Sequence, residues 1–180
     1  MNYHYDAYNP FLYNNLNTYM PINDIYSSTQ QTEANSIFVY PQNLQNALSL
    51  IQEALSGESE DRMFYSWLIE NAPSYEDQQI INGIRDNEIG HYELFHELYY
   101  DLTSTIPPLN PDEQFIPPEN YCAALSRALL GEQNAVQKYR KILYAMQSRI
   151  HINVMIEIIT DEIRHGILYN YLYAKNGCMG

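Results

Sequence analysis

Positively charged residues are scarce in this sequence of 180 residues. It has 9 Lys and Arg against 22 Asp and Glu, which gives a formal net charge of −13 at pH 7. A protein that binds nucleic acid needs a basic stripe to meet the phosphates. We therefore expect no nucleic-acid partner. An acidic surface mainly favours solubility, although it also attracts cations.

Cysteines and long apolar runs are also lacking. Cys122 and Cys178 form no C-x-x-C pair, so they build neither a Cys-rich zinc module nor a rubredoxin-type module, and no disulfide framework is expected. No stretch of about 18 uninterrupted apolar residues is present, which argues against a membrane span. The first residues lack the basic segment and apolar run of a signal peptide. The sequence therefore predicts a soluble, cytoplasmic protein without a membrane partner.

Residues 1–41 differ in composition from the rest of the chain. They are rich in Tyr and Asn, are interrupted by Pro10, Pro21 and Pro41, and show no helical period. We interpret them as an N-terminal tail that packs on the rest of the chain or on a partner. The remaining residues, 42–180, are predicted to form one domain.

Helical periodicity runs through most of the second part. It predicts four helices, at about 42–71, 75–102, 118–147 and 149–175. Between the first two, Ser74 is a candidate N-cap with Asp77 three residues further on. The second and third are joined by a Pro-rich stretch, Thr103 to Pro118. A connection of that length suits a crossover along a helical bundle.

The two halves of the helical part repeat each other. The segment Ala54–Glu58 recurs as Ala128–Glu132, at an offset of 74 residues. The same offset matches further pairs: Tyr65 with Tyr139, Glu88 with Glu162, His91 with His165, Leu98 with Leu172, and Tyr99 with Tyr173. Two hairpins sharing a core pattern would explain the apolar and aromatic matches. They would not explain why two Glu and one His repeat as well.

The spacing of the repeated glutamates indicates that they lie at one level. In each half they are thirty residues apart, and two residues of a helical hairpin are level when the turn lies midway between them. The first midpoint is Pro73, inside the predicted turn, and the second falls beside Ser148. Apolar residues at helical spacing, among them Ile51 and Ile158, place these glutamates on buried faces.

Four buried carboxylates at one level would repel each other. Two divalent cations would balance their charge. Glu and His three residues apart share a helix face, so each E-x-x-H pair can chelate a metal there. The predicted metal ligands are Glu58, Glu88, His91, Glu132, Glu162 and His165. A third E-x-x-H, at Glu93 and His96, lies on another face and has no counterpart 74 residues later, so we interpret it as a solvated surface.

This pattern, E…E-x-x-H repeated, resembles the ferritin-like superfamily of carboxylate-bridged di-metal proteins. The segment Asp161–His165 is similar to the last helix of its rubrerythrin-like branch, and the resemblance covers about residues 42–175. It implies an all-α fold: an antiparallel four-helix bundle of two repeated hairpins with a long crossover between helices 2 and 3. It also implies that Glu88 and Glu162 bridge two metals and that the other four ligands are terminal.

The resemblance implies roles for further residues. Tyr65 and Tyr139 are similar to the tyrosines beside the site in this superfamily, and they are candidate catalytic residues; plain core aromatics are the alternative. Asp161 is placed to hold the opposite histidine by a hydrogen bond. Ala135 stands where rubrerythrins carry an extra glutamate, and Asp61 is a possible substitute ligand. Together with the missing rubredoxin module, this weighs against a rubrerythrin-type peroxidase.

Oxygen and imidazole ligands suit iron or manganese better than a structural zinc ion. We expect two Fe ions per chain, with Mn as the other candidate, and a ferroxidase-type oxidoreductase that uses Fe(II) with O2 or peroxide for iron storage or detoxification. A manganese catalase-like enzyme is the first alternative. The second is a structural coat or compartment protein with a stabilising metal. A homo-oligomer, or a protein compartment bound through the N-terminal tail, is a possible partner.

Overall fold

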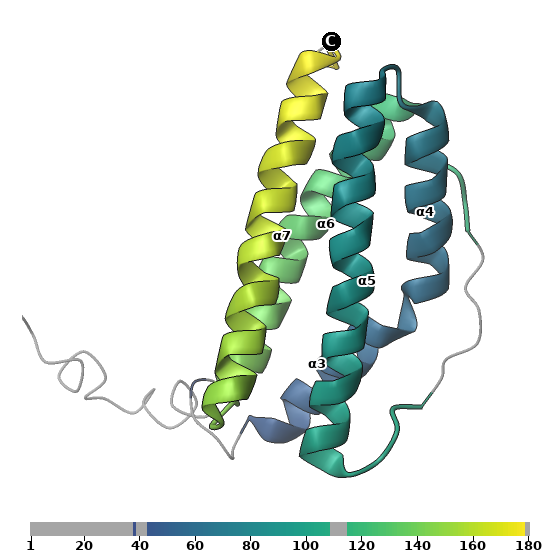
Figure 1. The fold of residues 1–180 in the computed structure, drawn as a ribbon. Helices are drawn as coiled ribbons and strands as arrows, with labels where there is room; N and C mark the ends of the chain where they lie inside the picture. Colours follow the sequence, from purple (N-terminus) through teal and green to yellow (C-terminus); the bar gives the residue numbers. More distant parts are fainter. Residues whose placement is uncertain (1–37, 39–42, 109–114, 179–180) are drawn as a thin grey trace, which may run out of the picture. The chain divides into compact units, whose positions relative to one another are not determined.

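The computed structural model of the protein describes residues 38, 43–108 and 115–178, and the regular secondary structure in these ranges is entirely helical. The predicted all-α bundle is therefore confirmed (Figure 1). The helices are α3 (Leu44–Ser56), α4 (Glu58–Asn71), α5 (Tyr75–Thr103), α6 (Tyr121–Leu143) and α7 (Arg149–Lys175). Most of the predicted N-terminal tail lies outside the described residues, so the domain boundary at residue 42 remains a prediction.

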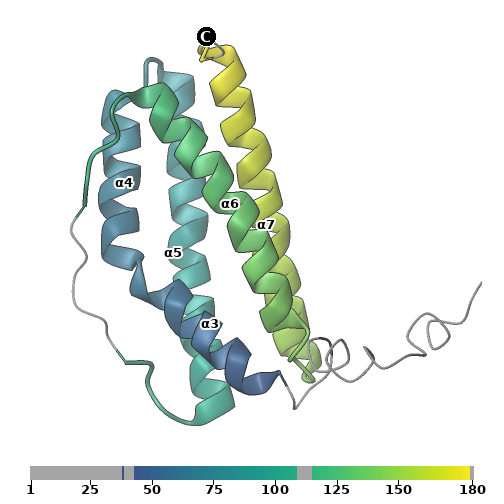
Figure 2. The same ribbon diagram turned by 180° about the vertical axis from the view of Figure 1, so that it is seen from behind.

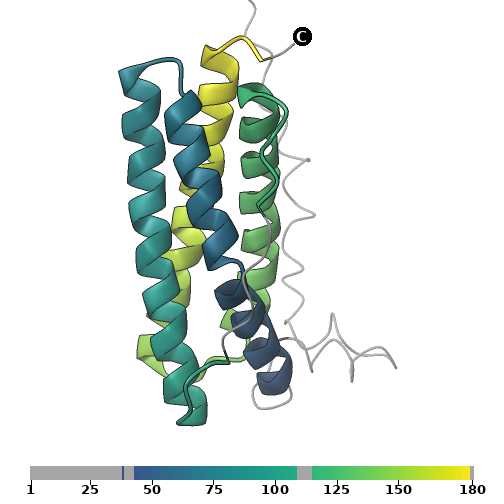
Figure 3. The same ribbon diagram turned by 90° about the vertical axis from the view of Figure 1, so that its right-hand side faces the viewer.

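The first predicted helix is interrupted. A continuous helix over 42–71 was expected, but α3 ends at Ser56 and α4 begins at Glu58, with Gly57 between them. The two pieces follow each other with a bend that is visible in Figure 3. Glycine lowers helix stability by about 1 kcal/mol relative to alanine. The equivalent Gly131 nevertheless lies inside an unbroken α6, so glycine alone does not end the helix.

The starts of α5 and α6 follow local capping rules. Ser74 accepts a hydrogen bond from the Asp77 backbone nitrogen at 3.2 Å, as the sequence predicts. The start of α6 is later than residue 118 because Asn120 is its N-cap, accepting from the Ala123 nitrogen at 2.9 Å. The end of α6 is Leu143 rather than 147.

The crossover joins opposite ends of the bundle. The C-terminal end of α5 and the N-terminal end of α6 lie at opposite ends of the molecule (Figures 1 and 2). The chain leaves α5 through Ser104, whose φ of 57° lies in the left-handed region. Residues 109–114 of the connection lie outside the described residues. The antiparallel arrangement of α6 and α7 is clear in Figure 2.

The core consists of two apolar clusters. One contains Ile51 and Phe95 together with the start of α7, and the other contains Leu68 and Ile84 together with the end of α7. On α5, α6 and α7 the residues between these clusters are the predicted metal ligands. The fold therefore holds a polar layer between two apolar layers, shielded from water on both sides.

A disulfide joins Cys122 and Cys178, with a Cα–Cα distance of 5.4 Å. The spacing of the two cysteines implied no disulfide framework, and for this pair the structure corrects that expectation. Cys122 lies in the first turn of α6, and Cys178 follows the last turn of α7. The two cysteines meet because antiparallel packing brings these two helix ends together. None of the described helices is long and apolar enough to cross a membrane.

Candidate metal centre

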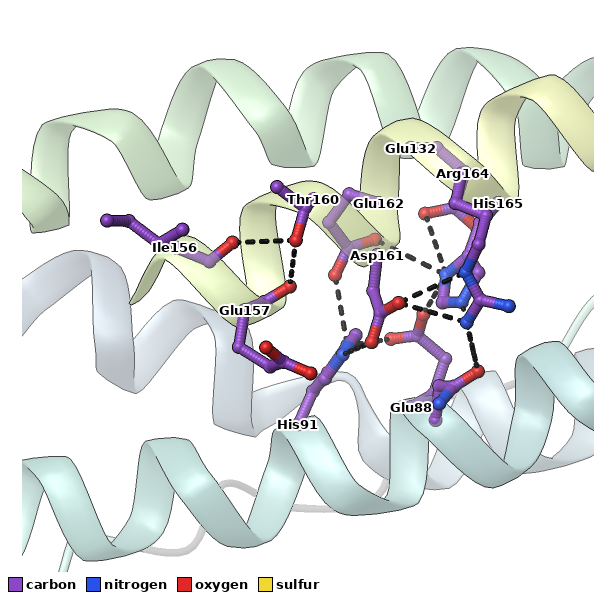
Figure 4. A network of polar contacts seen from close by, with 11 residues as sticks. Glu88, His91, Glu132, Ile156, Glu157, Thr160, Asp161, Glu162, Arg164 and His165 are labelled. Carbon is purple, nitrogen blue, oxygen red and sulfur yellow. Dashed lines mark hydrogen bonds and ion pairs between the residues drawn. The ribbon is translucent and has the colours of Figure 1, made fainter. Parts of the chain in front are cut away.

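Among the described side chains, those of the polar layer come from three helices. Glu88 and His91 come from α5, Glu132 from α6, and Glu162 and His165 from α7 (Figure 4). All are buried except Glu88, which is partly exposed. The sequence predicted this convergence from spacing, and the structure brings these five residues together.

Glu88 and Glu162 each face both histidines. Glu88 places Oε1 2.8 Å from His165 Nδ1 and Oε2 3.5 Å from His91 Nδ1. Glu162 places Oε1 3.1 Å from His91 Nδ1 and Oε2 3.9 Å from His165 Nδ1. Each carboxylate thus presents one oxygen to each imidazole, as a carboxylate that bridges two metal ions would.

Several atoms in this layer have unsatisfied bonding capacity. Oε1 of Glu88 and of Glu162, and Nδ1 of His91 and of His165, are buried and have no hydrogen-bond partner among the described residues beyond the mutual contacts just given. Buried polar atoms without partners are rare and cost free energy. These four atoms converge on one small volume. The residues present therefore fit a metal centre.

A four-residue set is complete within the described chain. One donor atom each of Glu88, Glu132, Glu162 and His165 lies within 4.8 Å of the other three. Three carboxylates and an imidazole are ligands that suit iron or manganese. His91 is not part of this set, but its Nδ1 lies 3.5 Å from Glu88 Oε2 and 3.1 Å from Glu162 Oε1.

Glu58 is the sixth predicted ligand. It is the first residue of α4, and its backbone position corresponds, in the repeat, to that of Glu132 on α6. Its side chain lies outside the described residues. Its role as a ligand therefore remains a prediction.

The carboxylates and histidines of this layer shift one another's pKa values. Burial and the neighbouring Glu162 raise the pKa of Glu132 to about 12. Burial would lower the pKa of His91, but hydrogen bonds to Glu162 and Glu88 and the charges of these carboxylates outweigh burial and raise that pKa to about 10. For Glu88 the signs are reversed: burial would raise its pKa, but the contacts with His165 and His91 outweigh burial and lower it. Cations are strongly favoured in this layer.

Each histidine is also contacted at its Nε2 atom by a residue of the neighbouring helix. His91 Nε2 lies 3.3 Å from Asp161 Oδ2, which is the contact that the sequence predicted. His165 Nε2 lies 3.4 Å from Asn87 Oδ1. Sequence reasoning did not assign this second contact, although Asn87 aligns with Asp161 in the repeat. Both contacts orient Nδ1 towards the centre of the site.

Tyrosines surround the carboxylates. Burial, followed by the charges of the carboxylates, raises the pKa of Tyr139 well above its ordinary value. For Tyr65 the causes are burial, then Tyr169, then Glu88. Both therefore remain neutral hydrogen-bond donors at any physiological pH.

Tyr169 is a residue that sequence reasoning missed. It is fully buried on α7, and its hydroxyl lies close to Tyr65 but has no hydrogen-bond partner among the described residues. Its place one turn after His165 could have signalled it. In the repeat it aligns with Phe95, whose ring lies 4.8 Å from that of Tyr139. At this position the two halves of the site therefore differ by one hydroxyl group.

A pocket of about 310 Å³ reaches the site between α4 and α6. Glu132, Glu88 and Glu162 lie on its wall, and Ala135 leaves room where a longer side chain would fill it. Asp61 is exposed and also lines the pocket. Glu93, the glutamate of the third E-x-x-H, is exposed on another face.

Comparison with known proteins agrees with this geometry. The family model of rubrerythrin matches residues 49–173. The chain is 30% identical over 122 residues to the uncharacterized protein YhjR of Bacillus subtilis (strain 168), which covers 67% of this chain and 82% of that protein. No solved structure matches.

Proposed function

Because the chain belongs to the rubrerythrin family, we propose that it is a di-iron protein of the ferroxidase type, which oxidises Fe(II) with O2 or peroxide. The observation that supports this best is the double contact of Glu88 and Glu162. Each carboxylate faces both imidazole Nδ1 atoms, and four of the donor atoms lack any other partner. Two cations side by side would satisfy them.

The ligand roles follow from these contacts. Glu88 and Glu162 would bridge the two ions, while His91 and His165 would each bind one. Glu132 would be terminal on the ion at His165, and Glu58 would be its counterpart on the ion at His91. Two ferrous ions held there would supply the two electrons that reduce O2 to peroxide, or peroxide to water.

The surrounding residues would prepare the site for this reaction. The apolar clusters on either side keep bulk water away, which strengthens the electrostatic interactions within the layer. Asp161 and Asn87 lie 3.3 and 3.4 Å from Nε2 of the two histidines, where they would accept its proton and so keep Nδ1 free for metal. The pocket between α4 and α6 would admit a small oxidant, with the neutral hydroxyls of Tyr65 and Tyr139 beside it.

The test is oxidation of bound iron. Anaerobic protein loaded with two Fe(II) per chain should form a ferric product, absorbing in the near ultraviolet, faster than Fe(II) in buffer when air is admitted. The reason is that one oxidant meets both irons in a single encounter. His91→Ala and His165→Ala should each slow the reaction, whereas the matched control Glu93→Ala should not.

Two results would contradict the proposal. Oxidation no faster than in buffer would remove the ferroxidase assignment. Vigorous release of oxygen from peroxide by the manganese-loaded protein, with no iron oxidation, would point to a manganese catalase-like enzyme instead.

A further inference from the structure

The two histidines of the site are held by chemically different groups. His91 faces the carboxylate of Asp161 at 3.3 Å, and His165 faces the amide oxygen of Asn87 at 3.4 Å. Asn87 and Asp161 occupy equivalent positions in the two halves of the repeat. The geometry is thus nearly the same on both sides, but only one side carries a charge.

Arg164 contacts both of these acceptors, and Figure 4 shows it beside Asp161 and His165. Its Nη2 donates to Asn87 Oδ1 at 2.7 Å, and that same oxygen faces His165. It also donates to Asp161, from Nε at 3.1 Å and from Nη2 at 2.9 Å, but there it uses Oδ1. The oxygen that faces His91 is Oδ2. Arg164 therefore shares the acceptor of His165, whereas at Asp161 it engages the carboxylate oxygen that does not face His91.

The acceptor behind a metal-bound histidine affects how strongly the ring binds. When Nδ1 binds a metal, the ring proton lies on Nε2, and an anionic acceptor there makes the ring a better donor. Replacing such a partner typically costs about 10- to 100-fold in metal affinity. An amide oxygen already engaged by a guanidinium group is a weak substitute for a carboxylate.

From these contacts we infer that the two metal positions are unequal: Asp161 makes the His91 position the tight one, and Asn87 with Arg164 makes the His165 position weaker and exchangeable. This rests on the two-metal site proposed above. A retained ion at His91 and an exchangeable ion at His165 suit a protein that takes up Fe(II) as substrate. Asn87 and Asp161 act here as positioning residues, through the histidines.

The test is a calorimetric titration of the metal-free chain with Co(II), which is not oxidised under these conditions. The unsubstituted protein should bind two ions in two steps, with the second weaker by about 10- to 100-fold. Asp161→Asn should weaken binding in the first step, and Asn87→Asp should tighten binding in the second. Both substitutions should therefore reduce the difference in affinity between the two steps. The visible absorption of the first Co(II) should shift in Asp161→Asn and stay unchanged in Asn87→Asp.

Histidine substitutions identify which step belongs to which position. His91→Ala should remove the tight step and His165→Ala the weak one. In the double variant N87D/D161N this assignment should reverse. Thermal unfolding followed by circular dichroism shows whether each variant is folded. The single substitution Asn87→Asp, which places a carboxylate beside Arg164, is expected to tighten metal binding, and misfolding would not produce that effect.

The outcomes separate this inference from the proposed function. Binding of fewer than two ions by the unsubstituted chain would overturn the two-metal site itself. Two steps of equal affinity, or a second step that Asn87→Asp leaves unchanged or weakens, would overturn the inequality while leaving the two-metal site intact.

Discussion

Asp77 holds three helices together at the end of the bundle that carries the disulfide, and its substitution is the sharpest test of how the bundle is stabilised. Its carboxylate is fully buried at the third position of α5. It accepts hydrogen bonds from Lys175, from Asn176 at 2.6 Å and from Tyr121 at 3.3 Å, and also from the Ser74 hydroxyl. These partners belong to α6, to the end of α7 and to the turn before α5.

The magnitude follows from these contacts. Hydrogen bonds to a charged group are worth about 1.5–3 kcal/mol each, and breaking a buried pair costs about 3–5 kcal/mol in total. Lys175 keeps a second partner, Glu76, at 2.7 Å and reaches solvent, which reduces the penalty. We therefore expect Asp77→Asn to lower the free energy of unfolding by about 2–3 kcal/mol at pH 7.

The effect of Asp77 should depend on pH in a defined direction. Burial alone would raise the pKa of Asp77, but the hydrogen bonds from Lys175, Ser74 and Asn176 outweigh it and lower the pKa below the ordinary 3.8. A carboxyl with a lowered pKa in the folded state contributes stability above its unfolded value, and this contribution is lost as the pH falls through the folded value. The difference between Asp77→Asn and the unsubstituted protein should therefore shrink below pH 3.8.

Urea denaturation of both proteins at pH 7 and at pH 3, with the disulfide intact, measures this difference. The matched control is Glu76→Gln, because Glu76 binds the same lysine from an exposed position and should matter little. Equal stability of Asp77→Asn and the unsubstituted protein at pH 7 would refute the reasoning. So would a difference that persists undiminished in acid.

Three further outcomes are expected. Glu88→Ala should abolish metal pairing because it removes a bridge, whereas Glu93→Ala should leave two ions bound; elemental analysis after loading decides, and the reverse result would show that the assigned helix register is wrong. Tyr169→Phe should raise the melting temperature of the metal-free protein, by the equivalent of about 1 kcal/mol, since it removes a buried hydroxyl without a partner; a drop of that size would show that the hydroxyl is satisfied. The metal-free protein should lose stability as the pH rises from 6 to 9, as measured by denaturant titrations. The reason is that the pKa values of Glu132, about 12, and of His91, about 10, are raised in the folded state, and the stability that such groups contribute is lost as the pH rises above their unfolded pKa values. A steady gain in stability over this range would contradict the assignment.

Much of the site could be predicted because it depends on short-range periodicity. An E-x-x-H pair shares one helix face whatever the helix packs against. Helix geometry alone therefore places Glu88 and His91 on the same face of α5. The repeat then placed Glu162 and His165 in the same relation. Their meeting at one level needed only the turn at Pro73, which proline and the Ser74 cap mark in the sequence.

Other features depend on contacts between distant segments and left no local signal. Gly57 and Gly131 occupy equivalent positions in the repeat, yet α3 ends before Gly57 whereas α6 continues through Gly131. The disulfide depends on which helix ends meet, so Cys122 and Cys178 could not be paired by spacing alone. Arg164 and His165 both contact the Asn87 side-chain oxygen only because α5 and α7 pack side by side.

The sequence by itself determined the fold class, the family and the chemical composition of the site. Each of these follows from residues whose spacing fixes a helix face or from a pattern repeated at a constant offset. Only the tertiary structure decided how the site is asymmetric: which acceptor stands behind each histidine, where Tyr169 lies, and on which side the pocket opens. These depend on distances of a few ångströms between helices, and helical periodicity carries no information about such distances.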